Sequence, residues 1–180
     1  MEKNSLLLFI IHHSSLTLCF HSPFTICHLP FTTYGFLMNE NPLRKQLAFA
    51  GALLFFIGMV TGLWTAAALT GKVSVGMPRM ALAAHLNALL GGLWLLAVAW
   101  SFEFLHYGER GLRRLALGVG LPAYANWLVT LVASFIGVNG LDYNGERAND
   151  VIAFLLQTLV VLPTLVASAF WAWGFRAKRV

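Results

Sequence analysis

A single histidine, His85, lies inside the long apolar run from Met77 to Trp100. A neutral imidazole can bind a metal through one ring nitrogen while a hydrogen bond holds the other, and it can also transfer a proton. An ionisable side chain within a membrane span is costly, and its presence there indicates a functional site. We therefore predict that any metal or cofactor chemistry is centred on His85.

Other polar side chains lie in the apolar part of the chain at comparable depths. In a span that begins near Met80, His85 lies about five residues, or roughly 8 Å, inside the membrane surface. Gln157 lies at a similar depth in a later span, and on depth alone it is the expected hydrogen-bond partner of His85. Tyr124 and Asn126 lie about two turns deeper. Asn87 follows His85 by two residues and should point to a different face of the helix.

The number of available ligands limits the metal chemistry. A closed zinc site needs four protein ligands and a catalytic one needs three, whereas the apolar spans contain no cysteine and no second deeply placed histidine. Haem iron needs only one axial ligand from the protein, because the porphyrin supplies four nitrogens. Three roles for His85 therefore stay open from residue chemistry: a hydrogen bond that bridges two helices, an axial ligand to haem, and a proton relay.

The composition is that of a membrane protein. Of the 180 residues, 58% are hydrophobic and 11% are charged, whereas soluble domains average about 25% charged residues. Four apolar spans, at about 47–69, 80–105, 115–137 and 151–175, each approach or exceed the roughly 20 residues that cross a bilayer. Such runs must be helical in lipid, and their connections are short. We predict an all-α integral membrane protein, an up-down bundle of four transmembrane helices over residues 38–180.

Residues 1–37 differ from the rest of the chain. They are rich in His, Ser, Thr, Phe and Cys, and their longest apolar run is far too short to span a membrane. The spacing of their histidines and cysteines fits no standard zinc site. We interpret this segment as an overlong start or a poorly ordered extension before Met38.

The basic residues predict the orientation, because short cytoplasmic loops carry an excess of lysine and arginine. One side carries most of them: Arg44, Lys45, Arg110, Arg113, Arg114, Arg176, Lys178 and Arg179. The other side carries Lys72, Arg79 and Arg147. We predict a multi-pass protein of the cell (inner) membrane, in contact with lipid, with both termini in the cytoplasm. No basic stretch interleaves with aromatic residues outside the spans, so nucleic-acid binding is not expected.

Smaller features bear on packing and on excluded chemistry. Gly58 and Gly62 have the spacing that lets helices approach closely, which fits packing within the bundle and a subunit interface equally well. Pro163 predicts a kink in the last span. Ser101 and Ser134 are isolated hydroxyls, expected to bond to a carbonyl one turn back and not to act as nucleophiles.

Two strings resemble a known family. PRMALAAHLNALLGG, around His85, and PAYANW, around Asn126, resemble the hydroxylaminobenzene mutases and their relatives, the styrene oxide isomerases. The resemblance covers about 41–175, includes four spans in matching order, and is strongest to the mutase branch. Residues 1–37 have no counterpart in it.

The resemblance implies a homotrimer of four-helix subunits that isomerises a small aromatic substrate. It implies haem b near a subunit interface, with His85 as the axial ligand and ferric iron as a Lewis acid. Asn126 would face the site, and with Tyr124 it would orient the substrate or hydrogen-bond the developing charge. We predict Arg79, in the Pro-Arg-Met string, and Gln157 as further cofactor-binding residues. An isomerisation consumes no electrons, so no redox partner is expected.

Two positions depart from the family pattern. The family commonly has an asparagine six residues after the histidine, where this chain has Gly91, and the isomerase branch has a tyrosine where this chain has Thr130. These differences argue against styrene oxide as the substrate. We expect an aromatic hydroxylamine to be rearranged to an aminophenol. The alternatives are an epoxide-to-aldehyde rearrangement, a non-catalytic haem membrane protein, and a cofactor-free packing protein in which His85 bonds to Gln157.

Overall fold

The computed structural model describes residues 41–176, and all regular structure in this range is helical. The segments are α2 (Pro42–Leu69), α3 (Pro78–Ser101), the short η1 (Phe102–Phe104), α4 (Glu109–Ile136), α5 (Arg147–Leu155), η2 (Leu156–Val161) and α6 (Leu162–Gly174). The last three follow one another directly and form one long helix. With that last helix, this range holds four helices long and apolar enough to cross a membrane, which confirms the all-helical membrane fold. The interpretation of residues 1–37 lies outside the described residues.

The local sequence explains where the helices begin and end. Before α2, the Asn41 side chain accepts a hydrogen bond from the Leu43 N–H at 3.1 Å, and Pro42 occupies the first turn. Proline is favoured there because its missing N–H would have no helical partner anyway. Pro78 likewise occupies the first turn of α3. α4 ends at Gly137 with a φ of 77°, a left-handed conformation that glycine adopts most readily.

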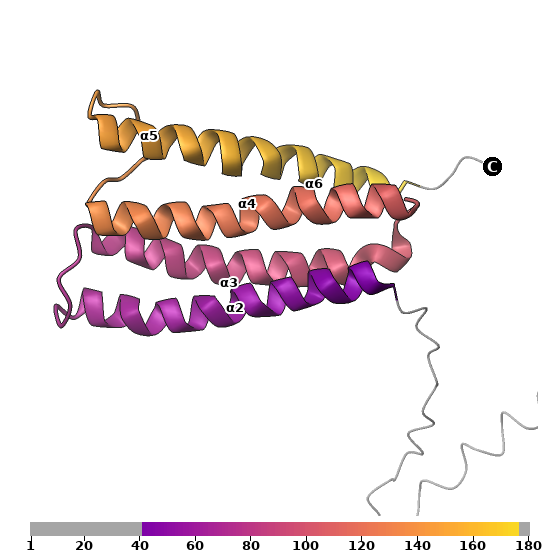
Figure 1. The fold of residues 1–180 in the computed structure, drawn as a ribbon, viewed down its shortest axis with the longest axis horizontal. Helices are drawn as coiled ribbons and strands as arrows, with labels where there is room; N and C mark the ends of the chain where they lie inside the picture. Colours follow the sequence, from indigo (N-terminus) through magenta and orange to yellow (C-terminus); the bar gives the residue numbers. More distant parts are fainter. Residues whose placement is uncertain (1–40, 177–180) are drawn as a thin grey trace, which may run out of the picture. The chain divides into compact units, whose positions relative to one another are not determined.

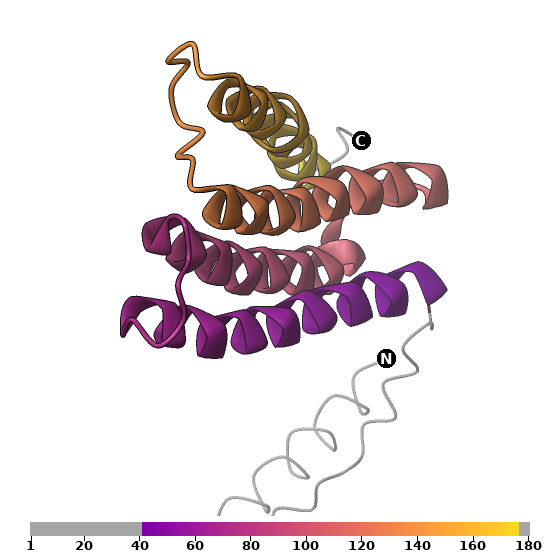
Figure 2. The ribbon, with the colours of Figure 1, turned by 60° about the vertical axis from the view of Figure 1, so that its left-hand side comes forward.

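The helices lie in a row, and neighbours in the sequence are neighbours in space (Figure 1). α3 packs between α2 and α4, which also touch each other, and the last helix packs on α4. Figure 2 shows the same order from another direction. Successive helices run in opposite directions, as an up-down arrangement requires. The row is open, however, because α3 and α4 separate α2 from the last helix.

Small and aliphatic residues fill the space between α2, α3 and α4, and large apolar side chains cover the outside. Gly51 and Gly92 approach so closely that a Cβ on Gly51 would lie 2.9 Å from the Gly92 carbonyl oxygen. Leu54 is fully buried between these helices, whereas Leu63 is 76% exposed. Exposed apolar surface of this kind suits lipid. The glycine-rich face of α2 therefore packs against α3 of the same chain.

The disturbance expected at Pro163 takes the form of a π-helical segment. η2 directly precedes α6, and Pro163 occupies the first turn of α6. Proline has no N–H and its ring collides with the carbonyl one turn back, so it removes a hydrogen bond from the α-helical ladder and distorts it. π-helical segments are frequent at functional sites.

Aromatic residues anchor one end of the last helix. Tyr107, between η1 and α4, stacks on Phe170 with the ring centroids 4.3 Å apart, and its hydroxyl donates to the Phe170 carbonyl. Trp171 donates from Nε1 to the Ser101 hydroxyl at 2.8 Å. Ser101 donates to the Val98 carbonyl at 2.7 Å, as predicted. These contacts hold α6 against the ends of α3 and α4.

We expect Tyr107→Phe to lower the free energy of unfolding by about 1 kcal/mol at neutral pH, because the hydrogen bond is lost while the stacking is kept. Burial raises the pKa of the Tyr107 hydroxyl above its usual range, so the folded state favours the protonated phenol. The contribution is complete below about pH 10, the unfolded-state value, and is lost as the pH rises further. Denaturant unfolding in detergent measures both effects. Equal stabilities of the two proteins at neutral pH would contradict this anchoring role.

Candidate functional site

His85 lies on α3 and faces α2. Its Nδ1 is 2.8 Å from the Gly58 carbonyl oxygen. The ring lies over Gly62, where a Cβ would come within 2.6 Å of the His85 Cε1. A carbonyl oxygen can only accept, so Nδ1 carries a proton, and in the neutral imidazole Nε2 then carries the lone pair. The helix-bridging role that the sequence left open is therefore present.

This hydrogen bond leaves the other ring nitrogen of His85 available. Among residues 41–176, His85 forms no hydrogen bond besides the one to Gly58, and its side chain is half-buried. Metal-binding histidines commonly have this arrangement: one ring N–H is held by a carbonyl or carboxylate, and the second nitrogen binds the metal. Bridging and ligation are thus compatible for this residue.

Of the two further residues predicted to bind the cofactor, Gln157 lies away from His85 within one chain. Gln157 is exposed on η2, and its Oε1 accepts a hydrogen bond from the Tyr143 hydroxyl at 3.2 Å. The predicted bond between His85 and Gln157 is wrong within one chain, because the last helix packs on α4 whereas His85 faces α2. Arg79 is exposed at the start of α3. It forms no ion pair within residues 41–176, where the one ion pair joins Arg44 to Glu103.

A polar network joins α3 to α4 on another side of α3. Asn87 donates from Nδ2 to Asn126 Oδ1 at 3.1 Å and to Thr130 Oγ1 at 3.4 Å. Thr130 in turn donates to the Asn126 carbonyl at 2.6 Å. Asn87 lies about 200° around the helix from His85. The prediction that these two residues point to different faces is confirmed.

This amide pair, Asn87 and Asn126, lines a cavity of about 250 Å³ between α3, α4, η2 and α6. Leu90, Trp94 and Val160 contribute apolar surface to its walls. A dry cavity of about 150 Å³ can hold a benzene molecule, so this one has room for a single aromatic ring with a polar substituent. The cavity fits the predicted substrate class in size and in polarity.

The structure brings only some of the predicted substrate residues to this cavity. Asn126 lines it. Tyr124 instead donates from its hydroxyl to the Ala50 carbonyl at 2.8 Å and so joins α4 to α2. Asn87 lines the cavity although we did not predict it as a site residue. Its signal in the sequence is a second polar amide within an apolar span, where such groups are rare and functional.

Of the two positions that depart from the family pattern, one lines this cavity and the other belongs to the hydrogen-bond network beside it. Gly91 lines it, and a Cβ there would be 3.2 Å from Leu54 Cδ2 and 3.3 Å from Ala123 Cβ. An asparagine at this position would require both neighbours to move. Thr130 forms part of the hydrogen-bond network of the amide pair.

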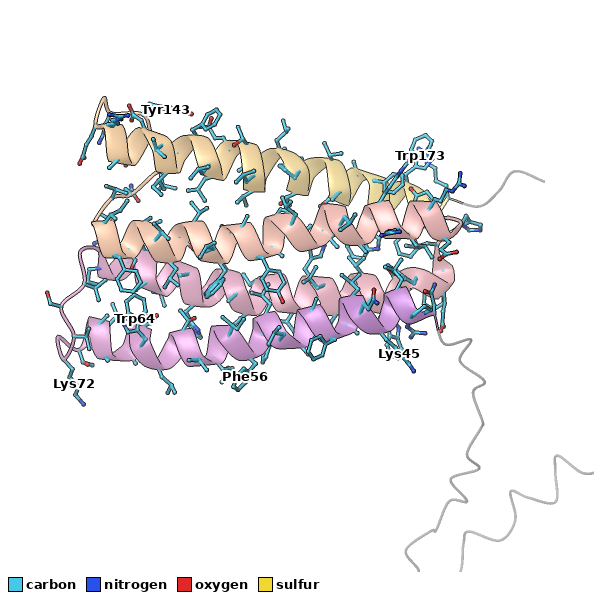
Figure 3. The ribbon with its side chains drawn as sticks, viewed as in Figure 1. Lys45, Phe56, Trp64, Lys72, Tyr143 and Trp173 are labelled. Atoms are coloured by element: carbon cyan, nitrogen blue, oxygen red, sulfur yellow. The ribbon has the colours of Figure 1, made fainter. Side chains whose placement is uncertain are left out.

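A second hollow, of about 400 Å³, lies between α2 and α4. Half of its eight lining residues are aromatic, among them Phe56, Trp64 and Trp127; Figure 3 shows the first two on α2. The one hydroxyl in its wall, that of Thr61, already accepts a hydrogen bond from Trp127 Nε1 at 3.3 Å and donates to its own helix. This hollow can hold an apolar group, but it offers little to orient a polar one.

Comparisons with known proteins identify the family. The family model described as styrene oxide isomerase matches residues 43–176, almost the whole described range. The chain belongs to the styrene oxide isomerase family. The hydroxylaminobenzene mutase HabB of Ectopseudomonas oleovorans is 34% identical over 148 residues, which cover 77% of this chain and 85% of HabB. The resemblance carried by the two sequence strings is confirmed, and it supports an enzyme of the isomerase type.

We expect Gly62→Ala to displace the His85 ring, because the added Cβ would overlap Cε1 and Nδ1. Overpacking of this kind lowers the free energy of unfolding by about 1–3 kcal/mol. Gly120→Ala on α4 is the matched control, since no atom from another part of the protein lies within 4 Å of a Cβ there and alanine favours a helix. Thermal unfolding in detergent compares the two variants. Equal midpoints would contradict the placement of the ring over Gly62.

Proposed function

We propose that this protein is a haem-dependent membrane isomerase that rearranges a small aromatic hydroxylamine to an aminophenol. The His85 side chain carries this proposal, because its Nδ1 is held by the Gly58 carbonyl and its Nε2 keeps a lone pair. The name of HabB, a hydroxylaminobenzene mutase, favours a hydroxylamine over an epoxide as the substrate.

The donor set fits haem better than a bare metal ion. Within residues 41–176, no three His, Cys, Asp or Glu side chains come together in a way that could hold a metal, whereas a zinc site needs three or four ligands. Haem iron needs only one ligand from the protein, because the porphyrin supplies four nitrogens. His85 Nε2 would hold the group. Ferric haem b, when bound, would supply a Lewis acid for the substrate oxygen.

The residues of this chain would bind the substrate and shield it from water. The reaction breaks the N–O bond, forms a C–O bond on the ring and moves one ring proton to nitrogen, so atoms and electrons balance without a redox partner. Negative charge develops on the departing oxygen, and Asn126 is a group that can donate a hydrogen bond to it. Apolar walls such as Trp94 would exclude water, which otherwise traps the cationic ring.

The different directions of His85 and Asn126 favour a site to which two copies of the chain contribute. In one chain His85 faces α2, whereas Asn126 lies on α4 and bonds to Asn87 on a different side of α3. We therefore propose a homotrimer in which the His85 edge of one subunit meets the Asn126 cavity of the next. A head-to-tail interface of this kind can close into a ring.

The proposed orientation accords with the distribution of charge. Figure 3 shows Lys45 and Trp173 at one end of the molecule and Lys72 and Tyr143 at the other. Among residues 41–176, most of the basic residues lie at the end with Lys45, in or beside the first turns of α2 and α4 and at the end of α6. We propose that this end faces the cytoplasm of a cell membrane, since cytoplasmic loops carry the excess of lysine and arginine.

We expect the purified protein to show a haem Soret band and to convert hydroxylaminobenzene to an aminophenol, measured by absorption and by chromatography of the products. His85→Ala should abolish the band and lower conversion at least about 100-fold, because the iron loses its axial ligand. His106→Ala is the matched control: His106 lies outside the spans and its Nδ1 bonds to the Gly174 carbonyl at 3.2 Å, so the band should persist.

An unchanged Soret band in His85→Ala would overturn the assignment of the ligand. Styrene oxide is assayed in parallel. Conversion of styrene oxide but not of hydroxylaminobenzene would overturn the assignment of the substrate and keep the isomerase.

A further inference from the structure

The hydrogen bonds around Asn87 fix the orientation of two amides at the 250 Å³ cavity. Thr130 donates its proton to the Asn126 carbonyl, so its oxygen must accept from Asn87. Asn87 therefore presents its NH₂ group to α4, and Asn126 must present its side-chain oxygen to that group. With this assignment, every contact in the network joins a donor to an acceptor.

Each amide keeps one polar group that pairs with nothing in the described part of the chain. Asn87 keeps Oδ1, an acceptor, and Asn126 keeps Nδ2, a donor. Neither of these two amide atoms is fully buried. In residues 41–176, the one fully buried side-chain polar atom without a hydrogen-bond partner is Ser134 Oγ. The predicted hydrogen bond of Ser134 to its own helix is therefore wrong. Both asparagines line the cavity. An unpaired amide oxygen beside apolar walls is costly, and a ligand that donates to it removes that cost.

We propose that Asn87 is a substrate-binding residue that selects aromatic substrates whose polar substituent carries an N–H or O–H; this rests on the proposed function. Asn87 Oδ1 accepts from that donor, and Asn126 Nδ2 donates to the substituent's oxygen. A hydroxylamine satisfies both groups. An epoxide satisfies only Asn126 and leaves Asn87 Oδ1 unpaired. Sites built to hydrogen-bond a substrate donor reject analogues that lack it more strongly than apolar pockets reject a change of size.

The cavity wall also carries a hydroxyl that can accept a hydrogen bond. Thr164, on α6, lines the cavity opposite the amide pair's helices. Trp94 also lines it, but an indole N–H only donates. The test must therefore distinguish ligand binding through the Asn87 side-chain oxygen from ligand binding through the Thr164 hydroxyl.

The experiment compares the binding of para-fluoroaniline, which carries N–H donors, with that of para-fluorotoluene, which carries none. Binding to the full-length protein in lipid nanodiscs is followed by fluorine NMR, and empty nanodiscs correct for partition into lipid. We expect wild type to bind the aniline at least about tenfold more tightly, the scale of one hydrogen bond. Asn87→Leu, similar in shape but apolar, should bring the two affinities within about twofold. Asn87→Ala gives the same comparison if the leucine variant does not fold.

Thr158→Val is the matched control, because the Thr158 hydroxyl donates to the Phe154 carbonyl of its own helix and the residue does not line the cavity. It should keep the wild-type preference. Absence of a preference in wild type, or a preference that survives both Asn87 variants, would overturn the proposal. A preference lost in Thr164→Val and kept in Asn87→Leu would also overturn it, in favour of Thr164.

The same proteins are assayed with hydroxylaminobenzene, which separates this inference from the proposed function. A loss of binding preference in Asn87→Leu supports the role of Asn87, whether or not wild type converts hydroxylaminobenzene. If wild type converts no hydroxylaminobenzene, only the proposed mutase function is overturned. Conversion by wild type that falls at least about tenfold in Asn87→Leu, with the Soret band unchanged, supports both.

Discussion

The hydrogen bond from His85 Nδ1 to the Gly58 carbonyl is the contact on which the proposed chemistry depends. An imidazole in lipid has no water to pair with, so its N–H must find an acceptor in the protein. α2 supplies that acceptor and also the space, because Gly62 lacks the Cβ that would overlap the ring. This contact fixes the tautomer, holds the ring and joins two helices. It also leaves Nε2 with the lone pair that a ligand to iron needs.

The position of α3 in the row determines what one subunit can do. Because α3 lies between α2 and α4, residues two positions apart on it serve different neighbours. His85 bonds to α2, and Asn87 bonds to Asn126 on α4. A single chain therefore presents a histidine on one side and a polar cavity on another. On our proposal these become one site only across a subunit interface, so trimer formation would be a condition of catalysis and not only of stability.

Much of the fold could be predicted from hydropathy, because lipid forces long apolar runs to be helical. The site could be predicted only in part. The depth of a residue in the membrane follows from its position along a span. Depth was the one reason for which we predicted a hydrogen bond between His85 and Gln157. Which helices touch depends on side-chain packing, and the structure places Gln157 on the helix that packs on α4. The opposite faces of His85 and Asn87 follow from helix geometry, but the bond of Asn87 to Asn126 requires the packing of α3 on α4.

The role of the α2 glycines shows the same limit. The spacing of these glycines predicted a close contact with another helix but did not say which helix. The His85 ring lies over Gly62, so the helix in contact is α3 of the same chain. Pro163 likewise predicted a disturbed helix. The structure shows a π-helical segment that includes Val160 of the cavity wall, and the sequence of a single span does not predict this form.

The central claim is that His85 of one subunit and Asn126 of another act on the same substrate, and complementation tests it most directly. His85→Ala and Asn126→Ala are co-expressed with different tags, and complexes that carry both tags are assayed for conversion of hydroxylaminobenzene. In a head-to-tail trimer, each mixed ring contains one interface with both residues intact, so about a third of the wild-type activity should return. Mixed complexes no more active than either variant alone would contradict the account.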